Sequence, residues 1–180
     1  MSKIVCFGEV LWDVFPKHKK IGGAPLNVAL RLQSFQNEVA LISCLGDDKL
    51  GNELLLELQK HRISSLYIQK IKAYKTSTVA ISLDKNGSAS YFINHPCAWD
   101  NIQVNDKLNS LVKSSEAFIF GSLIARSNTS RNTLLKLLTF SKLSVFDVNL
   151  RHPHYDMSSI QVLMNAANFI KFNDDELKEI

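Results

Sequence analysis

The chain has 180 residues, of which 46% are hydrophobic and 21% are charged, and its formal net charge is +4. This length and composition are typical of one globular domain with a sizeable core. The densest basic run is Lys17-His18-Lys19-Lys20. Because no aromatic residues interleave with it, we interpret it as a solvated loop rather than a nucleic-acid patch. No apolar run approaches the ~20 residues of a membrane span, and the N-terminus lacks a signal-peptide layout. We therefore expect neither nucleic acid nor membrane as a partner.

The three cysteines are an odd number and show no CxxC spacing. Cys6 and Cys44 lie in apolar runs, so we predict that they are buried free thiols. This usage fits a reducing cytoplasm better than a secreted disulfide scaffold.

The first third of the chain alternates between strands and helices. Lys3–Phe7 is continuously apolar, which is typical of a strand covered on both faces. Residues 10–15 form a second extended piece that carries Asp13. The pair Gly22-Gly23 then predicts a tight turn, and Pro25 suits the first turn of a helix that runs to about Ser34. That helix start offers free N–H groups to a polar ligand, although an ordinary loop-to-helix junction explains it equally well.

Further along, the apolar spacing predicts a strand at 39–45, a helix over 50–58 and a short strand at 66–71, and this alternation favours a parallel α/β sheet. The pattern then changes. Two strand-like runs at 76–83 and 88–93 flank Asn86-Gly87, which is the strongest short signal for a β-hairpin. A hairpin inside an α/β alternation predicts a small accessory sheet or lid.

Alternation then resumes to the end of the chain. The expected elements are strands at 117–120, 143–148 and 169–172, helices over 130–140 and 158–165, and a last helix that begins near Asn173. Asn173 and Glu176 have the spacing of a helix-capping pair, which explains them without a functional role.

Polar residues gather where the predicted strands end. In an open parallel sheet, ligands bind outside the carboxyl ends of the strands. This rule selects Asp13, Gly22, Gly23, Asp47, Gly121, Asn149, Arg151, Asn173 and Glu176. Arg151 could bind phosphate bidentately or form a surface ion pair. Together these residues predict a cleft that suits a sugar and a phosphate.

Six motifs follow one another in the chain: Gly8-Glu9-Val10-Leu11-Trp12-Asp13, Gly22-Gly23-Ala24-Pro25-Leu26-Asn27, Gly46-Asp47-Asp48-Lys49-Leu50-Gly51, Ala98-Trp99-Asp100, Asp147-x-Asn149-x-Arg151 and Asn173-x-x-Glu176. In this order they resemble the motifs of the ribokinase-like carbohydrate kinases of the phosphofructokinase-B type, and most of all those of fructokinases. The resemblance implies a three-layer sandwich with a mostly parallel central sheet and a small β lid, formed by segments of about 9–20 and 74–100.

The resemblance also implies a reaction, in which the γ-phosphoryl group of ATP is transferred to a sugar hydroxyl with Mg²⁺ present. The sugar, with fructose favoured, would be held by Asp13, Gly22, Gly23, Asn27 and Asp100. The phosphate side would comprise Asn149, Arg151, Lys171, Asn173 and Glu176, with Glu176 reaching the metal through water. A homodimer formed through the β lid would also fit this family.

One departure from the family pattern is large. The general base of the family is an aspartate in a C-terminal Gly-Ala-Gly-Asp stretch, and this sequence has no such stretch. We therefore expect residues 1–180 to be the N-terminal part of a kinase domain that lacks the nucleotide-binding part and is inactive alone. A non-catalytic sugar-binding or regulatory module is the alternative. A kinase of the same family acting on ribose, a nucleoside or a keto-deoxy sugar acid also stays open, because Asn94 stands where many fructokinases carry arginine.

Overall fold

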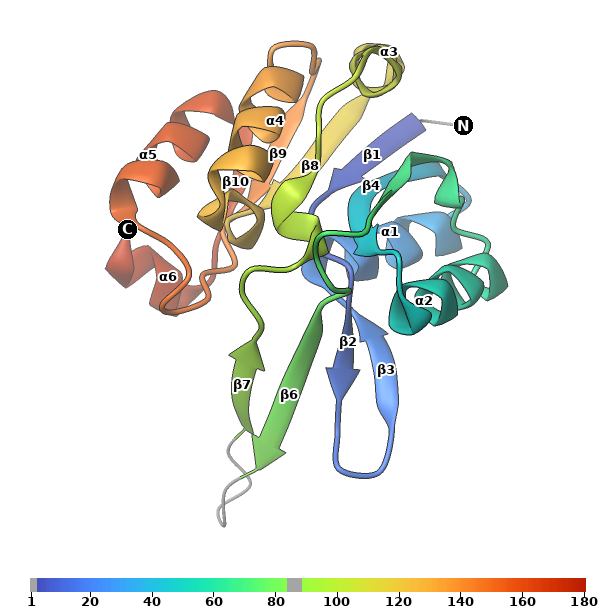
Figure 1. Ribbon diagram of the computed structural model, residues 1–180. Coiled ribbons are helices and arrows are strands. Elements are labelled where there is room, and N and C mark those ends of the chain that lie inside the picture. Colours follow the sequence, from blue (N-terminus) through green and yellow to red (C-terminus); the bar gives the residue numbers. More distant parts are fainter. Residues whose placement is uncertain (1–2, 84–88) are drawn as a thin grey trace.

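The computed structural model describes residues 3–83 and 89–180 and contains two sheets (Figure 1). The larger sheet has the order β10-β9-β8-β1-β4-β5, and every neighbouring pair in it is parallel. Its strands are β1 (Lys3–Phe7), β4 (Glu38–Gly46), β5 (Ile68–Ile71), β8 (Ala117–Gly121), β9 (Ser144–Asp147) and β10 (Phe169–Lys171).

Helices cover both faces of this sheet, as the continuous apolar strands predict. On one face, α1 (Ala24–Ser34) and α2 (Lys49–Lys60) enclose a core with Cys6 and Leu41. On the other face, α3 (Asp106–Ser114), α4 (Asn128–Leu138) and α5 (Met157–Ala166) enclose a second core, which contains Phe7 and Phe118. The last helix, α6 (Asp174–Glu179), follows β10. The predicted three-layer α/β sandwich is confirmed.

The smaller sheet projects from the larger one and has the order β3-β2-β6-β7 (Figure 1). It consists of β2 (Leu11–Val14), β3 (Lys19–Gly22), β6 (Thr78–Leu83) and β7 (Ala89–Ile93). Strands β6 and β7 pair antiparallel, which confirms the two strands of the predicted hairpin. The Asn86-Gly87 turn itself lies outside the described residues.

Two local predictions differ from the structure, and one helix was not predicted. Lys19 and Lys20 belong to β3 rather than to a loop, because β3 pairs with β2 and places Lys19 over the ring of Trp12. The segment predicted as a strand from Leu66 begins as a 3₁₀ helix, Ser65–Tyr67. Helix α3 was not predicted, although Asn105 caps it by accepting a hydrogen bond from the N–H of Leu108. Within the described residues, no helix is long and apolar enough to cross a membrane.

The strand order fixes where a ligand cavity can form. From β1 the chain builds outward through β4 and β5 on one side, and later through β8, β9 and β10 on the other. The order therefore reverses beside β1, and open α/β sheets bind ligands at such a switch point, outside the carboxyl ends of the strands. All three cysteines are buried and free, as predicted for Cys6 and Cys44.

Candidate functional site

A cavity of about 560 Å³ lies at the carboxyl ends of β1, β8 and β9, where the small sheet meets the large one. Loops and helix starts that are far apart in the sequence contribute its walls. The polar lining residues are Glu9, Asp13, Asn27, Asp147, Asn149 and Arg151, with Gly23 and Ala24 beside them, and the apolar ones include Leu11, Val79, Ile93 and Leu123. The cavity thus brings together five residues predicted for the sugar and phosphate, namely Asp13, Gly23, Asn27, Asn149 and Arg151.

Asp13 enters the cavity from β2, on the same strand face as Leu11. Its carboxylate lies directly over Gly22, where a Cβ atom would stand 2.2 Å from Asp13 Oδ2. Gly22 does not line the cavity itself, but it makes room for the carboxylate that does. Partial burial raises the pKa of Asp13 above its ordinary value.

The glycine turn continues with Gly23, which is the N-cap residue of α1. Its φ of +111° lies in the region that favours glycine, and a Cβ atom there would stand 2.3 Å from the carbonyl oxygen of Glu9. Pro25 occupies the first turn of α1, and the backbone N–H of Asn27 donates to the Gly23 carbonyl at 3.0 Å. The turn therefore packs directly on the end of β1 and presents Asn27 to the cavity.

Glu9 is the site residue that sequence reasoning missed. It is only 3% exposed, and its Oε1 accepts a hydrogen bond from the N–H of Ala24 at 3.0 Å. Its Oε2 has no hydrogen-bond partner within residues 3–83 and 89–180. Burial raises the pKa of this carboxyl to about 7. Its place directly after an apolar strand was the available signal, since that is where parallel sheets position ligand-binding groups.

Asn149 and Arg151 follow β9. The backbone of Asn149 has a φ of +41°, a conformation that asparagine tolerates better than most residues, and its carbonyl accepts a hydrogen bond from Ser122 Oγ at 3.3 Å. Such backbone strain is often found at functional sites. Arg151 is exposed and lines the cavity, so its guanidinium is accessible to an anionic ligand.

Comparisons with known proteins identify the family. The family model described as pfkB family carbohydrate kinase matches residues 1–180. The chain belongs to the pfkB family of carbohydrate kinases. An uncharacterised sugar kinase of Pyrococcus horikoshii is 32% identical over 196 residues, which cover 97% of this chain and 62% of the relative. A fructokinase of Solanum tuberosum is 29% identical, with coverage of 97% and 59%.

Solved structures of this family have the same fold. The P. horikoshii sugar kinase superimposes with a TM-score of 0.86 over 99% of this chain and 65% of its own, and it has also been solved in complex with ATP. A fructokinase of Xylella fastidiosa gives a TM-score of 0.87 at 21% identity, which is evidence for the fold alone. The chain spans about three-fifths of the length of the curated relatives named above.

Three residues predicted for the phosphate side of this pfkB protein do not line the cavity. Lys171 Nζ lies 2.9 Å from Asp147 Oδ1. Asn173 caps α6, and Glu176 completes the capping box by accepting from the N–H of Asn173 at 2.9 Å. The other oxygen of Glu176 accepts from the N–H of Leu150 at 3.0 Å. Asn173 and Glu176 therefore form the predicted cap, and Glu176 also ties the loop after β9 to α6.

These contacts bear on the Mg²⁺ that the family implies. Both oxygens of Glu176 already accept backbone hydrogen bonds, and its side chain is buried. In the described part of the chain, no group of three or more His, Cys, Asp or Glu side chains could hold a metal ion. These residues do not form a metal site by themselves, and a contact of Glu176 with Mg²⁺ through water stays a prediction.

The prediction that Asp100 binds substrate is not supported by its position. Asp100 is 1% exposed and lies outside the cavity lining. Its oxygens accept from Arg126 Nε at 2.8 Å and Nη2 at 2.9 Å, and also from the N–H of Cys97 at 2.9 Å. These donors occupy the carboxylate, so Asp100 shapes the Ala98-Trp99-Asp100 loop, and a contact of Asp100 with substrate stays a prediction. The sequence alone did not indicate Arg126 as the partner of Asp100, because the two residues are 26 positions apart in the chain.

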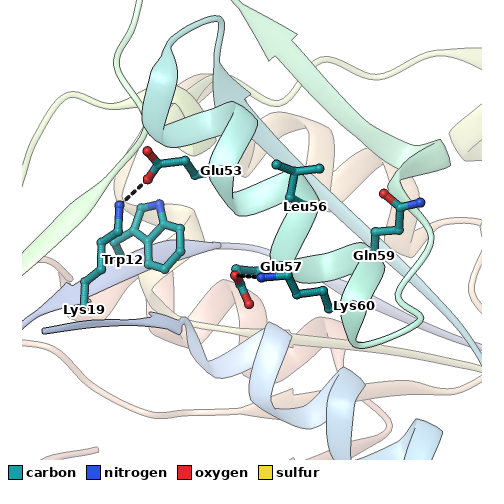
Figure 2. A pocket seen from close by; sticks show the side chains of 7 residues that line it. All are labelled: Trp12, Lys19, Glu53, Leu56, Glu57, Gln59 and Lys60. Atoms are coloured by element: carbon teal, nitrogen blue, oxygen red, sulfur yellow. Dashed lines mark hydrogen bonds and ion pairs between the residues drawn. The ribbon is translucent and has the colours of Figure 1, made fainter.

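Away from this cavity, a hollow of about 490 Å³ lies between the small sheet and α2 (Figure 2). Its charged groups are paired with one another: Lys19 with Glu53, and Lys60 with Glu57. Trp12 faces it, and the indole N–H donates to the Leu50 carbonyl at 3.0 Å. Since its charges are paired and it lies away from the switch point, we do not assign a ligand to it.

Proposed function

We propose that this chain carries the acceptor side of an ATP-dependent sugar kinase, with fructose as the favoured acceptor. The main support for this proposal is that Asp13, Asn27, Asn149 and Arg151 all line one cavity at the switch point of the sheet. Carboxylate and amide groups suit the hydroxyls of a sugar, and an accessible guanidinium suits a phosphate. The names of the fructokinase relatives support the choice of sugar.

In this proposal each residue has a stated role. The Asp13 carboxylate accepts hydrogen bonds from sugar hydroxyls, and Gly22 leaves the space in which that carboxylate sits. Asn27 holds a further hydroxyl from the first turn of α1. Arg151 and Asn149 lie toward the transferring phosphoryl group, where positive charge stabilises the transition state. ATP would supply that group when bound.

The small sheet has the role of a lid in this proposal. Leu11 and Asp13 on β2, Val79 on β6 and Ile93 on β7 all line the cavity. Phosphoryl transfer depends on exclusion of water, and a sheet that covers the acceptor provides it. The general base is not among the cavity residues that we assign, so we propose that residues 1–180 bind sugar without efficient turnover.

The decisive test is calorimetric titration of the 180-residue chain with fructose, together with an assay of ADP release from ATP and fructose. Binding of fructose without turnover is the expected result. Binding that is accompanied by turnover would overturn the assignment of the base outside this chain. Binding of sugar by a natural gene product that has no kinase activity would favour the alternative, a non-catalytic sugar-binding module.

A panel of acceptors tests the choice of sugar. Fructose, ribose, a nucleoside and a keto-deoxy sugar acid are titrated under identical conditions, because a few side chains decide acceptor choice in such sites. Fructose is expected to bind most tightly. A tighter complex with one of the other three would retain the sugar-kinase proposal and change its substrate.

We also propose that a second copy of the chain contacts the outer face of the small sheet. Register places Val14, Ala80 and Phe92 side by side across β2, β6 and β7. Phe92 is 70% exposed and Val14 is 37% exposed. Analytical ultracentrifugation tests this: Phe92→Ser should shift a dimer toward monomer, and a wild-type chain that is monomeric throughout would contradict the proposal.

A further inference from the structure

A second cavity is lined by residues that follow closely, along the chain, those of the proposed acceptor cavity, and the proposed function gives it no role. It has a volume of about 270 Å³ and is lined by His95, Arg126, Pro153, His154, Tyr155 and Asp156. The same three segments line both cavities. Ile93, Leu123 and Arg151 face the first cavity, and His95, Arg126 and Pro153 face the second a few residues further along each segment.

Arg126 is the buried group of this second cavity. Its side chain is only 4% exposed and packs on Trp99, with the guanidinium carbon 4.0 Å from the ring centroid. The Nε and Nη2 nitrogens donate to Asp100, and Nη2 also donates to the carbonyl of Asn94 at 2.7 Å. Nη1 has no hydrogen-bond partner in the part of the chain that the structure describes. A buried donor without a partner is costly, so it indicates a missing acceptor.

Histidines contribute to the same cavity as this guanidinium. His95 and His154 line the cavity with it, and His152 lies close enough to act on His154 electrostatically. The pKa of His154 is lowered first by burial and then by the positive charges of Arg126 and His95, while Asp100 opposes this. The neighbouring positive charges therefore disfavour protonation of His154. A bound anion would offset these charges and favour the protonated form of His154.

The acidic groups near this cluster are already engaged. Asp100 is held by Arg126, as described above. Asp156 caps α5 and accepts from the hydroxyl of Ser158, from the N–H of Ser159 at 2.8 Å and from the Ser159 hydroxyl at 2.7 Å, and these hydrogen bonds lower the pKa of that carboxyl to about 2. The hydroxyl of Tyr155 donates to Glu179. These contacts leave the two histidines as the accessible donors, and Arg126 adds its positive charge and the enclosed, unpartnered Nη1.

We propose that this second cavity is an anion-binding site for a phosphate or carboxylate group, held by His95, His154 and Arg126. A volume of about 270 Å³ accommodates such a group, and imidazole and guanidinium N–H groups are its natural donors. The site stands on its own geometry and does not require the sugar-kinase proposal to be correct. Its position beside the acceptor cavity allows the anion to be free or to be carried by the acceptor molecule.

The test is a titration of the 180-residue chain with inorganic phosphate, followed by NMR of the histidine side chains. The chain has five histidines, and His18 and His61 serve as internal controls because neither lines the cavity. We expect saturable shifts of the His95 and His154 signals, with His18 and His61 unchanged. Absence of shifts at His95 and His154, or equal shifts at all five, would overturn the proposal.

Substitutions sharpen the result. Because Arg126 is buried and ion-paired, its removal could unfold the chain, so the informative variant is His154→Gln, with His61→Gln as the matched control. Loss of one charge-assisted donor should weaken phosphate binding by about tenfold in His154→Gln and leave it unchanged in His61→Gln. An unchanged affinity in a folded His154→Gln chain would count against the site.

The source of the anion is settled by three ligands: inorganic phosphate, fructose and fructose 6-phosphate. If fructose 6-phosphate binds at least tenfold more tightly than phosphate and also shifts the amide signals of Gly23 and Asn27, the anion belongs to the acceptor. If both bind equally, the site takes a free anion. Failure of fructose to bind while phosphate still shifts His154 would reject the sugar-kinase proposal and retain the anion site.

Discussion

Strand β2 separates two hollows that differ in how they hold charge. Asp13 faces the proposed acceptor cavity, whereas its neighbour Trp12 faces the hollow beside α2 (Figure 2). On the acceptor side of β2, Glu9 lines the acceptor cavity and Arg126 lines the proposed anion cavity, and both Glu9 and the Asp100–Arg126 pair are almost completely buried. Around the other hollow, Lys19 and Glu53 pair with side chains that are 37% and 34% exposed.

The buried charges on the acceptor side of β2 need partners within the protein, whereas the exposed charges on the α2 side are stabilised by water. A buried ionic group costs free energy unless its partners remain, whereas an exposed ion pair contributes little because water screens it. We therefore expect conservative charge-removing substitutions to have large effects on the acceptor side of β2 and small effects on the α2 side. The predictions below test that ranking, from the largest effect to the smallest.

Asp100→Asn should have the largest effect. It removes the negative charge from a pair in which Arg126 is 4% exposed, so the guanidinium is left buried without compensation. Loss of one partner of a buried pair costs about 3–5 kcal/mol of unfolding free energy. Urea denaturation of the variant against wild type measures it. A loss below about 1 kcal/mol would place this pair with the exposed ones and erase the contrast between the two hollows.

Glu9→Gln should change how stability depends on pH. Burial raises the pKa of Glu9 from 4.5 to about 7, so the folded chain holds this proton more tightly than the unfolded chain does. The stabilisation from this group is complete below pH 4.5 and is lost as the pH rises through about 7. The full loss is on the order of 3 kcal/mol.

The glutamine side chain of the Glu9→Gln variant keeps an oxygen for the Ala24 N–H and does not titrate, so the difference between the two chains isolates this group. Chemical unfolding from pH 5 to 8 should show wild type losing stability relative to Glu9→Gln. If the unfolding free energies of wild type and Glu9→Gln change in parallel across this range, Glu9 does not change its protonation on unfolding. Its carboxyl would then be better solvated than the structure indicates.

Asp13→Asn tests the acceptor cavity directly. The substitution keeps the shape over Gly22 but replaces a charged acceptor of hydrogen bonds, which contributes about 1.5–3 kcal/mol in comparable cases. Fructose affinity should therefore fall by about ten- to a hundredfold. Asp106→Asn at the exposed start of α3 is the matched control and should bind as wild type does. Equal affinity in the two variants would remove Asp13 from the site.

Much of this contrast could be predicted from the sequence. The continuous apolar strands and the glycine turn predicted the layers and placed Asp13, Asn27, Asn149 and Arg151 at strand ends or at a helix start. The burial of Asp100 could not be predicted, because its partner Arg126 is 26 residues away in the chain. The role of Glu9 was not predicted for a related reason, since only the tertiary packing of Ala24 on the end of β1 shows that the Glu9 carboxyl is enclosed.

Glu53→Gln should have the smallest effect. Glu53 pairs with Lys19 and lies 4.0 Å from Lys49, whose side chain is 91% exposed, so water can replace what the substitution removes. Exposed pairs contribute little to the free energy of unfolding because water screens them, and added salt should reduce even that contribution. Urea denaturation at low and high ionic strength measures both quantities, and fructose affinity should be unchanged. A loss as large as that of Asp100→Asn would mean that the Lys19–Glu53 pair anchors β3 to α2, and that both sides of β2 depend on their charges equally.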